Sequence, residues 1–162
     1  GKAITGTSLL DFMCNPELVK LTLKAHEPKV VAADSVLALC CGVGVQTTAS
    51  VVDKVIHPGC NTLSLGGSHS EWREGERCLE CGDCVLEFTG GICPISRCAK
   101  NLFNGPCGGS SGGKCEVSKD LDCAWAQIID RLAKLGQLEK LAMVVPPKNW
   151  KVSLTGGPPV RR

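Results

Sequence analysis

Apolar positions in the first 70 residues alternate between short strand-like runs and stretches with helical spacing. The strand-like runs lie at residues 3–5, 9–10, 29–31, 36–39 and 55–56. Asn15-Pro16-Glu17 predicts a helix start, because Asn caps helices, Pro fits the first helical position and an acid favours the first turn. A second helix is expected over residues 45–52. Strands alternating with helices predict a small α/β lobe with a parallel sheet, a partial Rossmann- or flavodoxin-like arrangement.

The pattern changes after residue 70. Residues 71–123 show no sustained periodicity and are rich in Cys and Gly, so we expect loops held by bonds to sulfur. After Cys123, apolar residues at helical spacing predict an amphipathic helix that is capped by Asp120 or Asp122 and ends at Gly136. We therefore expect an α/β lobe at 1–70, a cysteine-rich lobe at 71–123, and a helix with an extended tail at 124–162.

Composition narrows the function classes. The chain has 162 residues, 43% of them hydrophobic, which is enough for a buried core. A net charge of +2 and an aromatic content of 4% argue against nucleic acid as the partner. No apolar run is long enough to span a bilayer and no signal peptide opens the chain, so we expect a cytoplasmic protein. The chain begins at Gly1 in strand-like sequence, and we expect a further N-terminal portion before it.

The unusual number is 12 cysteines. Eight lie between positions 78 and 123: Cys78, Cys81, Cys84, Cys93, Cys98, Cys107, Cys115 and Cys123. A disulfide framework fits poorly, because disulfides need an oxidising compartment and gain little from three thiols within seven residues. Structural zinc usually takes two short Cys pairs, whereas this stretch opens with a triplet. Zinc stays an alternative for one site.

Iron–sulfur clusters fit the spacing best. Cys78-x₂-Cys81-x₂-Cys84 can bind three corners of a [4Fe–4S] cube, and a remote Cys, often followed by Pro, binds the fourth. Cys93-Pro94 offers that dipeptide, but any later Cys could also serve. Eight thiols suffice for two clusters, and their partition cannot be read from the spacing.

Four cysteines stand apart from this stretch. Cys14 precedes a helix start and Cys41 follows a strand, so both are further candidate ligands, equally well explained as core residues. Cys40 is a weaker candidate, and Cys60 is expected to be structural.

The cysteine-rich stretch resembles a known family. Cys78-Leu-Glu-Cys81-Gly-Asp-Cys84, Thr89-Gly-Gly-Ile-Cys93-Pro, Asn104-Gly-Pro-Cys107-Gly-Gly and Asp122-Cys123-Ala-Trp are similar to the C-terminal domain associated with methylenetetrahydrofolate reductase. The resemblance covers roughly residues 30 to 150. That domain forms most of the small iron–sulfur V-type subunit of the reductases of acetogenic bacteria, which are anaerobes that use the Wood–Ljungdahl pathway of one-carbon metabolism.

The resemblance implies a role that the residues alone do not give. It implies a flavin-containing TIM-barrel reductase subunit as partner, further electron-donor subunits, and electron transfer to or from the partner's flavin. This chain shows no acid/base or nucleophile constellation, so no catalytic residue is expected in it. The alternative hypothesis is a zinc-binding, or mixed zinc and cluster, docking subunit of the same reductase with no redox role.

Overall fold

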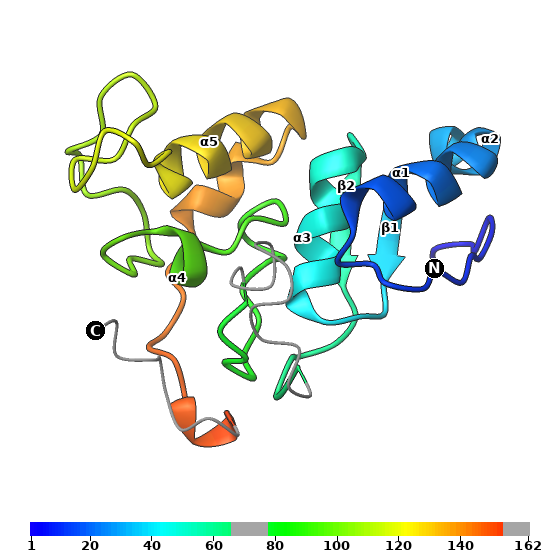
Figure 1. Cartoon of the computed structure of the whole chain (residues 1–162), viewed down its shortest axis with the longest axis horizontal. Helices are drawn as coiled ribbons and strands as arrows, with labels where there is room; N and C mark the ends of the chain where they lie inside the picture. Colours follow the sequence, from blue (N-terminus) through cyan, green and yellow to red (C-terminus); the bar gives the residue numbers. More distant parts are fainter. Residues whose placement is uncertain (66–77, 154–162) are drawn as a thin grey trace.

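The computed structural model describes residues 1–65 and 78–153 (Figure 1). Its elements in chain order are α1 (Pro16–Ala25), α2 (Glu27–Ala32), β1 (Ser35–Ala38), α3 (Gly42–Val51), β2 (Val55–Pro58), α4 (Pro94–Arg97), α5 (Ala124–Lys134) and the 3₁₀ helices η2 (Leu138–Ala142) and η3 (Trp150–Val152). The expected boundary between the first two lobes, at residues 70 and 71, lies outside the described residues. No helix in the described ranges is long and apolar enough to cross a membrane.

The first lobe contains a two-stranded parallel sheet, which confirms the α/β prediction. β1 pairs with β2 in the register Ser35↔Val55 to Ala38↔Pro58. The connection between them is α3, and a helical crossover is what two adjacent parallel strands require. The finer Rossmann- or flavodoxin-like arrangement is not tested by two strands. The core of this lobe consists of Ala38, Val45, Ala49, Val52 and Ile56, and Leu86 of the cysteine-rich segment packs with them.

Local sequence explains the start of α1 as predicted. The side chain of Asn15 accepts hydrogen bonds from the backbone N–H groups of Glu17 and Leu18, at 3.0 and 3.2 Å. These bonds satisfy two of the donors that a helix start leaves unpaired. Pro16 then occupies the first helical position.

Three of the predicted strand-like runs are not strands. Residues 3–5 and 9–10 form no regular structure and are largely exposed, with Ile4 86% and Leu9 93% accessible. A strand needs a partner for its backbone groups, and the described sheet ends at β1 and β2. Residues 29–31 belong to α2, where Pro28 fits the first turn of the helix and outweighs the β preference of the two valines.

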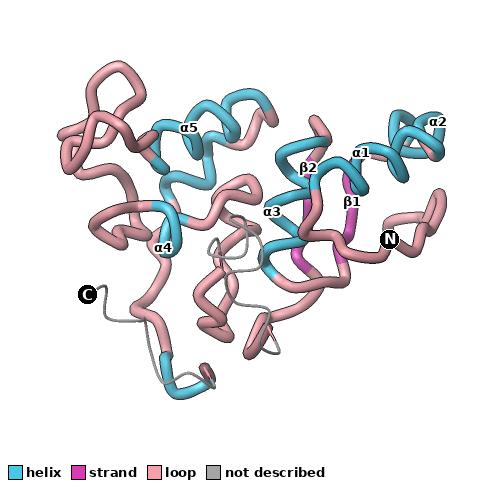
Figure 2. Tube along the Cα trace, viewed as in Figure 1, coloured by secondary structure: helices cyan, strands magenta, loops and turns pink. Residues whose placement is uncertain are grey.

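The cysteine-rich segment is mostly loop, as predicted (Figure 2). It packs on the first lobe through Leu86, which is 2% exposed, and through Gly91, where an added Cβ would lie 2.4 Å from the Cβ of Ala49. Gly91 has a φ of +84°, so glycine is required there both for the close approach and for the backbone conformation.

The predicted C-terminal helix is confirmed as α5. Trp125, Ile128 and Leu132 form its buried face and pack with Ile92, Cys98 and Cys123. Gly136, with a φ of +65°, ends the helix as expected. The predicted Asp cap is wrong, because the N-cap position is Cys123 and no side chain accepts a hydrogen bond there.

Candidate thiol sites

The N-terminal thiol site is a pocket that brings together four cysteines: Cys78, Cys81, Cys84 and Cys93. The first three come from the C-x₂-C-x₂-C loop, and Cys93 is the N-cap of α4. Gly42 and Gln46 of α3 and Thr62 also line it. The carboxyl end of the sheet, where ligands of parallel α/β folds bind, therefore faces this loop.

Asn61 and Thr62, which lie shortly after β2, hold the C-x₂-C-x₂-C loop, here called the thiol loop, in place. The side chain of Asn61 accepts a hydrogen bond from the N–H of Cys84 at 3.0 Å, and the carbonyl of Thr62 accepts one from Gly82 at 3.0 Å. The Thr62 hydroxyl oxygen accepts a third bond, from the N–H of Gly42, at 2.8 Å. One dipeptide thus ties the thiol loop to the start of α3.

Burial makes two thiols of this site weak acids. Burial raises the pKa of Cys78 to about 12 and that of Cys84 to about 11, from a value of 9.0. Hydrogen bonds to the sulfurs from the backbones of Glu80 and Leu86 act in the opposite direction, and the nearby Cys93 thiol raises both values further. An anionic thiolate at either position therefore needs a compensating positive charge, such as iron or zinc.

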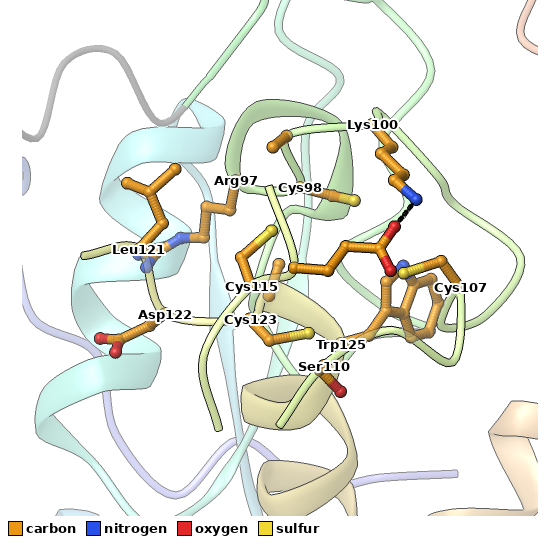
Figure 3. Close-up of a pocket in the computed structure, with 13 residues that line it drawn as sticks. Arg97, Cys98, Lys100, Cys107, Ser110, Cys115, Leu121, Asp122, Cys123 and Trp125 are labelled. Atoms are coloured by element: carbon orange, nitrogen blue, oxygen red, sulfur yellow. Dashed lines mark ion pairs between the residues drawn. The ribbon is translucent and has the colours of Figure 1, made fainter. Parts of the chain in front are cut away.

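The C-terminal thiol site is a second pocket with the other four cysteines: Cys98, Cys107, Cys115 and Cys123. Figure 3 shows their sulfur atoms arranged around the pocket, above the start of α5. The two pockets are alike in size, with free space of ≈ 380 Å³ at the N-terminal site and ≈ 400 Å³ at this one, open solvent included.

A small backbone ladder positions two of these thiols. Lys114 forms antiparallel bridges with Ser111 and with Asp122. Two further backbone hydrogen bonds extend this ladder. The N–H of Cys115 donates to the carbonyl of Leu121 at 2.9 Å, and the N–H of Cys123 donates to the carbonyl of Gly113 at 2.8 Å. Cys115 and Cys123 are thereby held side by side although eight positions separate them.

Two ion pairs lie at the C-terminal thiol site, whose lining also includes Arg97. Lys100 forms an ion pair with Glu116, drawn as the dashed line in Figure 3. Lys114 forms another with Asp122 at 2.7 Å. Trp125 closes the pocket, and its indole N–H donates to the carbonyl of Leu102 at 2.8 Å.

One helical turn joins the two sites. α4 begins directly after Cys93, a residue of the N-terminal thiol site, and its C-cap is Cys98, a residue of the C-terminal thiol site. The helix between the two cysteines has four residues, a little over one turn, and is about 6 Å long at 1.5 Å per residue. The sites are therefore neighbours in one structure.

Three of the remaining cysteines, Cys40, Cys41 and Cys60, lie near the N-terminal thiol site. Cys40 and Cys60 each follow a strand of the sheet by two residues, and burial raises the pKa of Cys40 to about 12, with Cys41, Cys60 and Cys84 raising it further. Cys41 also raises the pKa of the Cys78 thiol. Cys14 is half-buried before α1, and Cys60 is exposed. Ligand roles for Cys14 and Cys41 stay predictions.

Within residues 1–65 and 78–153, no group of three or more His, Cys, Asp or Glu side chains is arranged to hold a single metal ion. The donor chemistry of the two pockets still fits a sulfur-ligated group, because each contains four thiols and no histidine. A four-iron cluster binds each thiolate at a different corner, so its ligands are spread around a cube instead of converging on one ion.

Three residues of the N-terminal thiol site were missed from the sequence: Asn61, Thr62 and Lys148. None belongs to a motif, and they reach the site from two segments that lie far apart in the chain. Only the position of residues 61–62 shortly after the end of a strand could have suggested a ligand-facing role.

Comparison with protein families matches residues 57–151 to the family described as methylene-tetrahydrofolate reductase C terminal. The match covers more than half of the chain and includes all eight cysteines of the two sites. Searches of curated proteins and of solved structures each returned no match. The chain belongs to the methylene-tetrahydrofolate reductase C-terminal family, as its cysteine motifs predicted.

Proposed function

We propose that this chain is a cytoplasmic electron-transfer subunit that carries two [4Fe–4S] clusters. It relays single electrons to or from the flavin of a partner methylenetetrahydrofolate reductase, a TIM-barrel subunit, with further subunits as electron donors. The family assignment supports association with that reductase. The folate chemistry belongs to the partner, and this chain supplies the ligands and the surroundings of the clusters.

The grouping of the eight thiols supports two clusters. Cys78, Cys81, Cys84 and Cys93 would hold the first, and Cys98, Cys107, Cys115 and Cys123 the second. When bound, each cluster supplies a centre that stores and releases one electron without a proton. The backbone bonds to the sulfurs of Cys78 and Cys84 would lower the charge density on these ligands.

The observation that carries the proposal is the single turn of α4 between Cys93 and Cys98. Electron tunnelling rates fall steeply with distance, so a relay requires neighbouring centres. A purely structural pair of sites has no such requirement. The bonds from Cys93 and Arg97 to Gln46 fix the turn at both ends.

The second candidate function is a zinc-binding docking subunit of the same reductase. The number of thiols favours it, because each pocket contains the four ligands that structural zinc takes. In that case the sites would stabilise the loops and position the reductase without carrying electrons.

Metal analysis with EPR spectroscopy separates the two functions. We expect anaerobically purified protein to contain about eight iron atoms and to give reduced-cluster signals after dithionite treatment. Cys81→Ser and Cys115→Ser should each remove about half of the iron, from different sites. Cys60→Ser, at an exposed cysteine outside both pockets, is the control and should retain all of it. Stoichiometric zinc with no iron would overturn the redox function.

A further inference from the structure

Lys148 is a buried cation at the N-terminal thiol site. Its side chain is only 4% exposed, and its ammonium nitrogen has no hydrogen-bond partner among residues 1–65 and 78–153. Its one ion-pair neighbour in the described part of the chain is Asp83, 3.8 Å away and half exposed. Asp83 lies between Cys81 and Cys84, so the ammonium is at the thiol loop. The positive charge of Lys148 is also close enough to the Cys84 thiol to lower its pKa, against the larger effect of burial.

Both flanks of Lys148 are fixed, so its position is set by the fold. Upstream, the Asn104 side chain donates to the carbonyl of Val145 at 2.9 Å and accepts from its N–H at 2.8 Å. Downstream, Val152 lies so close to Gly82 that an added Cβ would be 2.8 Å from its side chain. The segment between these anchors crosses the N-terminal thiol site.

A buried ammonium without hydrogen-bond partners is costly, because it has lost its water and a 3.8 Å ion pair with a half-exposed carboxylate replaces that water only in part. An anionic occupant beside it removes that cost. Four thiolates around a [4Fe–4S] core form such an anion, and its sulfur atoms accept hydrogen bonds.

The C-terminal thiol site differs in this respect. Its lysines, Lys100 and Lys114, are neutralised by the carboxylates of Glu116 and Asp122. Both side chains are also far more exposed than that of Lys148, at 40% and 45%. Of these three lysines, Lys148 is therefore by far the least exposed, and at 3.8 Å its ion pair is longer than that of Lys114.

We propose that Lys148 is a positioning residue that raises the reduction potential of the cluster at the N-terminal thiol site by placing a buried positive charge beside it. This inference rests on the proposed function. Reduction adds one electron from the donor to the cluster and makes it more negative by one charge. A nearby cation stabilises the reduced form more than the oxidised form, so the electron is accepted at a higher potential.

The test is a redox titration of the full chain, followed by EPR spectroscopy. Lys148→Met removes the charge and keeps the chain length, so the N-terminal cluster should show a lower potential. We expect its ratio of reduced to oxidised form at a fixed potential to fall about tenfold, which is a shift of about 59 mV for one electron. Lys148→Arg should retain the potential. The control Lys151→Met removes a lysine charge three residues away and should change neither cluster.

The outcomes separate this proposal from the function on which it rests. Wild-type protein without any cluster signal would overturn both. Two clusters with unchanged potentials in Lys148→Met, or an equal shift in both, would overturn the role of Lys148 alone. Loss of iron from the N-terminal site in Lys148→Met and Lys148→Gln, with retention in Lys148→Arg, would support the need for a positive charge. Loss of iron in all three would overturn it.

Discussion

The side-chain oxygen of Gln46 accepts hydrogen bonds from the backbone N–H of Cys93 and from Nε of Arg97, both at 3.1 Å. Gln46 is 2% exposed and lies on α3, more than forty residues before its two partners. Its own amide group donates to the carbonyl of Gly42 at 3.2 Å. The α/β lobe therefore fixes both ends of the helical turn that joins the two thiol sites.

Gln46→Leu should destabilise this junction. The substitution leaves the Cys93 N–H without its acceptor inside the protein, and such a loss costs about 1–3 kcal/mol of unfolding free energy. We expect a lower Tm for the anaerobically purified variant and slower electron exchange between the two clusters. Ser50→Ala, on the same helix, is the control and should change stability by less than about 0.5 kcal/mol. An unchanged Tm in Gln46→Leu would show that the junction does not depend on this side chain.

The sequence predicted regular elements well where one local signal dominated. Asn15 and Pro16 specify the start of α1, and Gly136 specifies the end of α5. The run Lys29-Val30-Val31 is short and β-branched, which favours a strand, whereas Pro28 one residue earlier favours a helix start. Short apolar runs carry too little periodicity to separate the two.

The candidate ligands were predicted as a set, whereas their grouping was not. Loops of seven or eight residues separate most of the later cysteines, and spacing does not predict where such loops return. The grouping depends on tertiary contacts: the Lys114 bridges that hold Cys115 beside Cys123, and the Gln46 bond that holds Cys93. The burial of Lys148 could not be predicted from the sequence either, because a lysine that follows two prolines is typical of an exposed tail.

Alkylation of the metal-free protein should distinguish the buried thiols from the exposed ones. The thiolate is the reactive form, and a pKa raised from 9.0 to about 12 reduces the thiolate of Cys78 about a thousandfold at pH 8. Burial also limits access to this sulfur. We therefore expect iodoacetamide to modify the exposed Cys107 and Cys60 first, and Cys78 and Cys84 last. Mass spectrometry of timed samples measures the order. Equal rates at Cys78 and Cys107 would contradict the structure.

Arg131 of α5 connects the C-terminal helix to the first lobe, and its loss should be costly. Its guanidinium donates to the carbonyls of Val52 and Lys54 at 2.7 and 3.0 Å, and it pairs with Asp53 at 3.2 Å. The side chain is 11% exposed, so Arg131→Met should lower the unfolding free energy by about 2–3 kcal/mol, measured by urea denaturation. Lys134→Met is the matched control. Lys134 also pairs with Asp53 but is 59% exposed, and its loss should cost less than about 1 kcal/mol. Equal effects of the two substitutions would argue against an anchoring role for the carbonyl bonds.

Glu87 gives the fold a dependence on acid pH. Partial burial alone would raise its pKa, but hydrogen bonds from His57 at 2.8 Å and Lys140 at 3.0 Å outweigh burial and lower the pKa below 4.5. A lowered pKa in the folded state contributes stability above pH 4.5, which is lost as the pH falls through the folded value. We expect Glu87→Gln to be less stable than the wild type by up to about 1 kcal/mol at pH 7, because the carboxylate is one-third exposed and partly screened.

The Glu87 prediction is checked by comparing thermal unfolding of the two proteins from pH 7 down to pH 3.5. The difference in Tm between wild type and Glu87→Gln should shrink below pH 4.5, since the wild-type carboxyl then also becomes neutral. Comparing the two proteins at each pH cancels the effect of acid on the thiol sites. Glu139→Gln, at the start of η2, serves as the control and should leave the Tm difference from wild type close to zero throughout. A Tm difference for Glu87→Gln that stays constant across this range would mean that its carboxylate charge does not stabilise the fold.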